Sequence, residues 1–305
     1  MIYTTEVPRF GSEKRSIITL GKFDGLHRGH QKLIRRVRAL KEAQQETLVF
    51  TFDVSPLIRL GKTEQKFLLT NEERRMLAES MGVDYLVECP FTEQMMHMEP
   101  EVFVKEFLAE RLRACAVVVG PDFRFGYQRK GTPELLQKLG QIYDFSVEIL
   151  EKEREGDREI SSTYIREELA KGQMEKVNAM LGYPYFTKGE VIHGHQLGRT
   201  IGVPTINLMA PSHKEFPPYG VYVTKTTIGD TVYQGITNVG YKPTVGETFL
   251  GIETNLFDCS RDLYGMEAKV AFYHYLRPEK KFSTIEMLKK QLQLDEKAGR
   301  EFFDF

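Results

Sequence analysis

The sequence predicts an α/β domain built on a parallel sheet, followed by an antiparallel barrel or sandwich that ends in a helix. Three observations support this order. Up to about residue 150, short β-rich runs alternate with helical segments. After Gly182, β-rich runs are joined by Gly, Pro and Asn turns. The C-terminal segment then becomes helical in pattern, and 305 residues suffice for two domains.

In the first half, five apolar runs are predicted as strands and four segments between them as helices. Strands separated by helices form a parallel sheet with covered faces, because parallel strands need crossover connections. Helix Gln31–Ala43 has an apolar face, and the cations Lys32, Arg35, Arg36 and Arg38 fall on its polar face, which we expect to be solvated. The strands are Ser16–Leu20, Thr47–Phe52, Tyr85–Cys89, Ala116–Val119 and Ser146–Leu150, and the other helices are Glu72–Met81, Pro100–Arg111 and Pro133–Gln141.

The charged run Glu151–Glu159 predicts a solvated loop or linker, followed by two short helices. The second half then contains five strand-like runs and a closing helix, which fits an antiparallel barrel or sandwich better than another α/β layer. The helices are Thr163–Lys171, Met174–Leu181 and Ile285–Phe303, and the strands are Lys188–His193, Val221–Thr227, Val232–Val239, Gly251–Phe257 and Ala268–Tyr275.

The composition argues against several classes of protein. A formal net charge of -1 offers no broad basic surface, so we expect no nucleic-acid partner. The three cysteines lie far apart, which argues against a disulfide framework or a local zinc site. No apolar run could cross a bilayer and no secretory signal is visible, so we expect a cytoplasmic protein with no membrane partner.

The densest motif of the first half follows the first strand and opens the first helix. A helix start offers free N–H groups and positive potential for phosphate, and glycines allow close approach of the backbone. Two imidazoles there could donate to phosphoryl oxygens as charge builds on a leaving pyrophosphate. The alternative is a Gly-rich turn with two incidental histidines. The candidate residues are Gly21, Phe23, Asp24, Gly25, His27, Gly29 and His30.

A second segment places hydroxyls at a helix start with a guanidinium one turn later. Hydroxyls are common helix caps, but a cation just inside a helix start is unusual, so an anionic partner is indicated. The residues are Ser161, Ser162, Thr163 and Arg166.

A glycine-bounded loop follows the fourth strand and carries aromatic and basic side chains. Its candidate ligand-binding residues are Asp122, Phe123, Arg124 and Phe125. On pattern alone, an ordinary solvated basic loop is the alternative.

The dense motif of the second half runs from Gly194 to Asn207. Its glycines suggest a flap over phosphates, while Thr205 and Asn207 would share one face of a strand. Two neutral oxygen ligands together with substrate phosphates suit Mg²⁺. A turn followed by a strand with one polar face is the alternative. The other candidates are Gly194, Gly198, Arg199, Gly202 and Pro204.

These motifs resemble those of a known family. The motifs H-x-G-H and I-S-S-T-x-x-R are similar to the pair of signatures of the nucleotidyltransferase superfamily. The loop after strand four resembles the flavin-side loop of bacterial FAD synthetases. The second-half motif resembles the riboflavin kinase signature G-R-x-x-G-x-P-T-x-N, and the match continues through Pro218–Tyr222, Asn238–Thr244, Glu253–Thr254 and Asp262–Gly265. Together these matches cover nearly the whole chain, which resembles the bacterial bifunctional riboflavin kinase/FAD synthetase (FMN adenylyltransferase) family.

The resemblance implies a Rossmann-like nucleotidyltransferase domain over residues 1–183 and a six-stranded riboflavin kinase barrel over residues 184–305. It implies that MgATP phosphorylates riboflavin to FMN, with Glu253 as general base, and that FMN is adenylylated to FAD with release of pyrophosphate. His27 and His30 would then serve catalysis in the first half. Three residues depart from the family pattern: Ser55 replaces a usual histidine, Lys22 a neutral residue and Ile206 a small one.

Two alternatives stay open at this point. The chain could be a riboflavin kinase whose adenylyltransferase domain is weakened by the histidine lost at Ser55. It could also be a non-catalytic flavin-binding regulator or RNA partner, although the near-zero net charge and the presence of Thr205, Asn207 and Glu253 argue against this.

Overall fold

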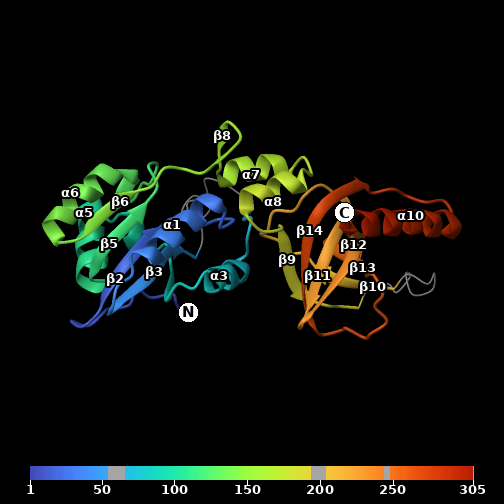
Figure 1. Cartoon of the computed structure of the whole chain (residues 1–305), viewed down its shortest axis with the longest axis horizontal. Coiled ribbons are helices and arrows are strands. Elements are labelled where there is room, and N and C mark those ends of the chain that lie inside the picture. Colours follow the sequence, from blue (N-terminus) through green and yellow to red (C-terminus); the bar gives the residue numbers. More distant parts are fainter. Residues whose placement is uncertain (54–65, 194–203, 244–247, 305) are drawn as a thin grey trace. The chain divides into compact units, whose positions relative to one another are not determined.

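The computed structural model describes residues 1–53, 66–193, 204–243 and 248–304 (Figure 1). The chain divides into two compact units. The first contains Met1–Phe67 and Asn71–Ser161, and the second contains Leu68–Thr70 and Ser162–Phe305. Each unit has its own six-stranded sheet and its own hydrophobic core.

The sheet of the first unit is parallel throughout, as predicted. Its strand order is β1-β4-β3-β2-β5-β6, so the direction of strand addition reverses between β2 and β5. The five predicted strands are confirmed with small shifts at their ends, and a short sixth strand, β1, joins the edge beside β4. The strands are β1 Ile2–Thr4, β2 Arg15–Leu20, β3 Gln45–Phe52, β4 Tyr85–Cys89, β5 Ala114–Val119 and β6 Ser146–Ile149.

Helices cover both faces of this sheet (Figure 1). Val37 of α1 packs against Ile17 and Val118 on one face. Leu108 and Leu136, from the helices after β4 and β5, belong to the larger core on the other face. The helices are α1 Arg28–Ala39, α3 Asn71–Ser80, α4 Glu93–Met96, α5 Pro100–Phe103, α6 Pro133–Tyr143, the π-helix η1 Val104–Arg111, which continues α5, and the 3₁₀ turn η2 Tyr127–Arg129.

The charged run after β6, predicted as a solvated loop or linker, contains no buried residue and forms a small hairpin in its second part. Strand β7 (Arg154–Glu155) pairs with β8 (Arg158–Glu159), and both belong to the first unit. The expected solvated face of α1 is confirmed for Arg35, Arg36 and Arg38, which are exposed, while Lys32 is half-buried. Lys32 and Arg36 also form ion pairs with Glu153 and Glu148. Sequence periodicity identifies a polar helical face, but not the charges that a later segment of the chain brings to it.

The second unit is an antiparallel barrel that is nearly closed. Its strand order is β10-β13-β12-β11-β14-β9, and a bridge between Ile192 and Asn207 links the two outer strands. Two helices, α7 (Ser162–Leu169) and α8 (Met174–Leu181), precede it. The strands are β9 Phe186–Glu190, β10 Thr205–Met209, β11 Gly220–Ile228, β12 Thr231–Pro243, β13 Thr248–Leu256 and β14 Glu267–Pro278.

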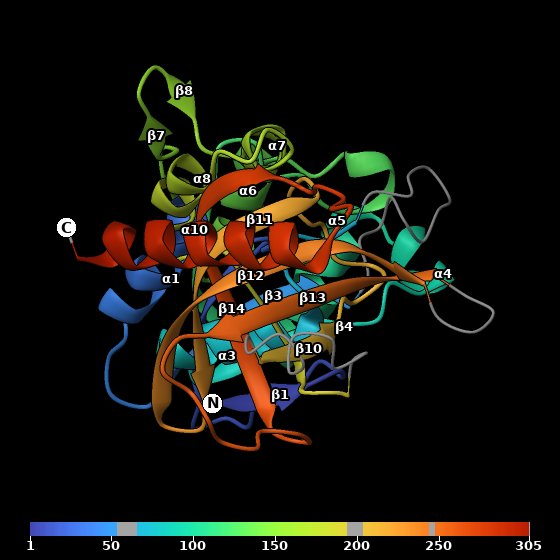
Figure 2. The same ribbon diagram turned by 90° about the vertical axis from the view of Figure 1, so that its right-hand side faces the viewer.

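The closing helix α10 spans Ile285–Phe303, as predicted, and lies across the barrel strands (Figure 2). Its C-terminal Phe302 packs on Val223 and Ile236, which therefore mark the outer face of the barrel. Ile236 pairs with Asn255 on β13, so Asn255 and, two residues earlier, Glu253 lie on this same outer face.

Candidate active sites

The histidine motif of the first unit forms a strained turn between β2 and α1. Three of its residues have φ angles in the left-handed region: Phe23 at 48°, Gly25 at 82° and Leu26 at 36°. The Phe23 side chain is fully buried, and Gln31 Nε2 donates to the Leu26 carbonyl oxygen at 2.9 Å. Packing therefore holds a backbone conformation that is otherwise unfavourable. Such strain is typical of ligand-binding turns.

The two histidines of this turn stack on each other. Their ring centroids lie 3.7 Å apart and their planes differ by 20°. The Nδ1 atoms of His27 and His30 are both buried, with no hydrogen-bond partner among the described residues. Gly29 favours this arrangement, because a Cβ atom there would lie 3.2 Å from Cε1 and Nδ1 of His27 and would push this ring aside. The start of α1 thus presents two imidazoles where its dipole favours an anion.

Burial keeps both imidazoles neutral near pH 7. It lowers the pKa of His27 to about 4, although the charge of Asp122 partly offsets this effect. Burial, and then the proximity of His27, hold the pKa of His30 well below 6.5. A neutral imidazole still carries one N–H donor, so each ring can bind a phosphoryl oxygen without the cost of burying a full charge.

These lowered pKa values predict that the first unit loses stability on mild acidification. An unfolded histidine takes up its proton near pH 6.5, whereas folded His27 does so only near pH 4. Between these values the unfolded state binds more protons, so the free energy of unfolding falls as the pH falls. Below about pH 4 the loss in free energy of unfolding that is due to His27 approaches roughly 3 kcal/mol. Urea denaturation followed by circular dichroism at about pH 7 and about pH 5 measures this dependence.

The variant His27→Asn provides the control for this pH dependence. Asparagine is favoured at the N-cap position that His27 occupies, and it does not titrate in this range. We expect the variant to lose less stability than the wild type between the two pH values. A pH dependence identical to that of the wild type would assign it to other groups.

The loop after β5 is divided between the core and the surface. Phe125 is 9% exposed and exchanges two backbone hydrogen bonds, of 2.9 and 3.2 Å, with Gly131. Phe123 is half-buried and stacks on Phe125 with ring centroids 5.4 Å apart. Asp122 and Arg124 are exposed. Phe125 therefore anchors the loop, and the other three predicted residues are the ones a ligand could reach.

The histidine turn and this loop leave the same edge of the sheet. Ile17 of β2 pairs with Ala116 of β5 in parallel, and each segment follows the carboxyl end of its strand. The strand order reverses between these two strands, and open α/β sheets bind ligands in the crevice at such a point. The charge of Asp122 acts on His27, which agrees with this proximity.

The second predicted ATP motif begins at the boundary of the two units. Ser161 ends the first unit, while Ser162, Thr163 and Arg166 lie on α7 in the second. Helix α7 begins at Ser162, one residue before the predicted start, and Arg166 is half-buried. The approach of these side chains to the histidine turn stays a prediction.

In the barrel, the structure brings Thr205, Asn207 and Glu253 together. Asn207 is paired directly with Glu253 across β10 and β13, and Thr205 Oγ1 donates to Glu253 Oε1 at 2.8 Å. Asn207 is 9% exposed, and the other two side chains are half-buried. A hydroxyl, an amide and a carboxylate thus form one oxygen-rich group on the outer face of the barrel.

Several predicted residues of this site lie outside the described part of the chain. Pro204 begins the described segment, and its carbonyl oxygen accepts a hydrogen bond of 2.8 Å from Asn255 Nδ2. The position of Ser55, the departure from the family pattern in the first half, is also outside. The predicted barrel-site residues that lie outside the described part of the chain are Gly194, Gly198, Arg199 and Gly202.

The structure adds a carboxylate that the sequence did not indicate. Glu279 Oε1 accepts a hydrogen bond of 3.0 Å from Asn238 Nδ2, and Asn238 pairs with Glu253 across β12 and β13. Gly240 makes room for Glu279, because a Cβ atom at this glycine would lie 1.9 Å from Glu279 Oε1. Only the glycine could have been a signal in the sequence, and by itself it does not point to Glu279.

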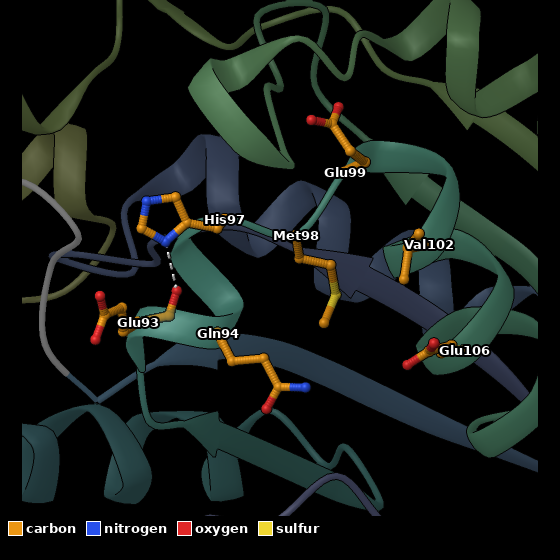
Figure 3. A pocket seen from close by; sticks show the side chains of 7 residues that line it. All are labelled: Glu93, Gln94, His97, Met98, Glu99, Val102 and Glu106. Carbon is orange, nitrogen blue, oxygen red and sulfur yellow. Dashed lines mark hydrogen bonds between the residues drawn. The ribbon is translucent and has the colours of Figure 1, made fainter.

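A cleft of about 560 Å³ lies on the first unit along α4, α5 and η1 (Figure 3). None of its seven lining residues was predicted to belong to a site. Three of them are glutamates, which makes this surface unfavourable for a triphosphate. Its lining residues are Glu93, Gln94, His97, Met98, Glu99, Val102 and Glu106.

A parallel α/β unit with a histidine turn at its switch point, together with a barrel that carries a Thr, Asn and Glu group, defines a two-domain enzyme that acts on nucleotides. The family model described as FAD synthetase matches residues 10–164, and the model described as riboflavin kinase matches residues 181–303. The chain belongs to the bifunctional riboflavin kinase/FMN adenylyltransferase family.

Relatives of this name match along most of their length. The Bacillus subtilis protein is 37% identical over 302 residues, which cover 95% of this chain and 93% of the relative. The Listeria monocytogenes protein is 36% identical over 291 residues, which cover 94% of this chain and 92% of the relative. The Escherichia coli K12 protein is 35% identical over 294 residues, which also cover 94% of this chain and 92% of the relative.

A solved structure shares the architecture of the whole chain. It is the crystal structure of a protein named macrolide-efflux protein from Streptococcus pneumoniae, with a TM-score of 0.88, 31% identity and 98% of both chains covered. That name differs from the one shared by the three relatives. Within the part of this chain that the structure describes, no helix is long and apolar enough to cross a membrane.

Proposed function

We propose that this chain phosphorylates riboflavin to FMN with MgATP and then joins FMN to the AMP part of a second ATP to form FAD, releasing pyrophosphate. The observation that carries the proposal is the presence of both chemical groups in one chain: the stacked neutral histidines at the start of α1 and the Thr205, Asn207 and Glu253 group on the barrel. The two family models, matched in the same order, support it.

In the proposed kinase reaction, Glu253 is the general base. Its carboxylate accepts the proton of the primary hydroxyl of riboflavin as that oxygen attacks the γ-phosphorus of ATP, and ADP leaves. The hydrogen bond from Thr205 at 2.8 Å holds one oxygen of this carboxylate in place. The base is thereby oriented before the substrate arrives.

The oxygen donors around Glu253 fit Mg²⁺. Thr205 offers a hydroxyl oxygen and Asn207 an amide oxygen, on a strand that turns both side chains to one face. A hard cation that keeps few protein ligands prefers such a set, completed by phosphates and water. Thr205 and Asn207 would hold the ion, which when bound neutralises charge on the transferred phosphoryl group.

In the proposed adenylyl transfer, the phosphate oxygen of FMN attacks the α-phosphorus of ATP, and the bond to pyrophosphate breaks. No covalent intermediate with the protein is needed. His27 and His30 donate hydrogen bonds to the phosphoryl oxygens, and Ser162, Thr163 and Arg166 complete the triphosphate site. The loop after β5 takes the flavin. Catalysis then consists of positioning and of stabilising the charge that develops on the leaving group.

We place the adenylyltransferase function in residues 1–183 and the kinase function in residues 184–305. The order of the two matched family models, over residues 10–164 and 181–303, supports this assignment. We also propose a cytoplasmic location, which the three free cysteines support. The net charge of -1 supports small molecules rather than nucleic acids as the partners.

Chromatography of reaction products tests the proposal. The purified protein is incubated with riboflavin and MgATP, and separately with FMN and MgATP. We expect FMN and FAD from the first mixture and FAD from the second. FMN without FAD would leave a riboflavin kinase with an inactive first domain, and flavin binding without any product would point to a regulator.

A further inference from the structure

The segment Glu151–Glu159 connects three parts of the proposed adenylyltransferase site. On one side it is attached to α1: Glu153 pairs with Lys32 at 3.1 Å and with Arg28 at 3.6 Å, and Glu155 pairs with Arg28 at 2.8 Å. Lys32 Nζ also donates to the Glu151 carbonyl oxygen at 2.9 Å. Arg28 stands directly after His27, so these pairs hold the start of α1, where the histidines lie.

One residue of this segment, Lys152, faces a second part of the site. Its Nζ atom lies 3.0 Å from Asp122 Oδ2 and 3.0 Å from Glu159 Oε2. Asp122 opens the flavin-side loop after β5. Glu159 ends β8, two residues before Ser161 of the predicted triphosphate motif. A single ammonium group therefore joins the loop expected to bind flavin to the segment that leads into the phosphate motif.

The position of Asp122 makes its charge important for the site. It is the acidic residue whose charge acts on His27, and its side chain is 72% exposed. A carboxylate near a triphosphate or an FMN phosphate repels both of these anions unless a cation offsets it. Lys152 supplies this cation and is itself only 29% exposed.

We propose that Lys152 is a positioning residue of the adenylyltransferase site, which offsets the charge of Asp122 and holds the flavin-side loop against the β7–β8 hairpin. This inference rests on the proposed function. It adds a residue from the segment that the sequence indicated only as a charged, solvated stretch. Lys152 acts through Asp122 and Glu159, so it needs no direct contact with either substrate.

A purely structural role would have a different signature. Partly exposed ion pairs contribute little to folding stability, so loss of Lys152 should leave the urea midpoint nearly unchanged. The unbalanced charge of Asp122 should instead weaken the binding of the anionic substrates. We therefore expect Lys152→Met to raise the KM values for ATP and FMN in FAD formation about 3- to 10-fold, with a smaller change in kcat and less effect at high salt.

The test compares the wild type with three variants of the full-length protein, Lys152→Met, Lys152→Arg and Lys41→Met, in FAD formation from FMN and MgATP. Lys152→Arg retains the cation, so its KM values should stay near those of the wild type. Lys41→Met is the matched control, because it removes another lysine–aspartate pair of the first unit, between Lys41 and Asp84 before β4. Only Lys152→Met should show the raised KM values. All four forms should phosphorylate riboflavin equally.

A double variant separates the proposed route from other effects of losing a lysine. If Lys152 acts by offsetting Asp122, then Lys152→Met should raise the KM values little further when Asp122→Asn is already present. Unchanged KM values in Lys152→Met, or an equal increase with and without Asp122→Asn, would overturn the inference. Absence of FAD formation by the wild type would instead overturn the proposed function, so the two failures are distinguishable.

Discussion

Replacing Glu253 with glutamine is expected to lower the rate of riboflavin phosphorylation by about 10²- to 10⁴-fold, the usual contribution of a general base. Glutamine has the same shape and can still accept the hydrogen bond from Thr205 that the carboxylate accepts at 2.8 Å, but it cannot take the proton. FAD formation from supplied FMN should be unchanged. Initial rates of both half-reactions, measured by chromatography of the flavins, provide the comparison.

The matched control for this variant is Glu267→Gln. Glu267 begins β14 of the same barrel and forms an ion pair with Lys188, outside the Thr205, Asn207 and Glu253 group. It should retain kinase activity. If Glu253→Gln phosphorylated riboflavin at the wild-type rate, Glu253 would lose its role as the base, and Glu279, linked to Asn238 on the neighbouring strand, would be the next carboxylate to examine.

Replacing His30 with alanine is expected to reduce FAD formation from FMN by about 10²- to 10³-fold, the usual cost of losing one donor to a developing negative charge. The loss also removes the stacking partner of His27, so both imidazoles would be disturbed. Phosphorylation of riboflavin should continue at the wild-type rate. Parallel assays of the two half-reactions measure this separation.

His97→Ala is the control for the histidine variant. His97 is an exposed imidazole of the same unit, and its Nδ1 atom lies 3.0 Å from the Glu93 carbonyl oxygen. The variant His97→Ala should leave the rates of both reactions unchanged. An equal loss of FMN and FAD formation in His30→Ala would contradict the assignment of two separate sites.

Most of the fold could be predicted from the sequence because its strands and helices carry strong local patterns. The run of β5 is continuously apolar, and the buried runs of β2 and β3 are interrupted only by Ser and Thr, as expected for a parallel sheet covered on both faces. Helices α8 and α10 begin and end at the predicted residues. Strand β1 was missed since three partly exposed residues carry no periodic signal. Helix α1 begins at Arg28 rather than Gln31, because the helix starts within the histidine motif.

The candidate sites could be predicted only as far as their residues are close in sequence. The spacing of His27, Gly29 and His30 indicated a phosphate-binding turn, but the neutral, stacked state of the rings depends on burial that no local pattern reveals. Lys152 and Asp122 likewise meet only because β5 and β6 pair in parallel, so that the segments after these two strands leave the same edge of the sheet. Such pairs depend on tertiary structure.

The most direct test of two independent active sites in one chain is complementation between single-site variants. Glu253→Gln and His30→Ala are incubated with riboflavin and MgATP, first separately and then mixed, and FAD is measured by chromatography. We expect little FAD from either variant alone and abundant FAD from the mixture, because His30→Ala supplies FMN that Glu253→Gln adenylylates. A mixture that makes no more FAD than the separate variants would contradict the account.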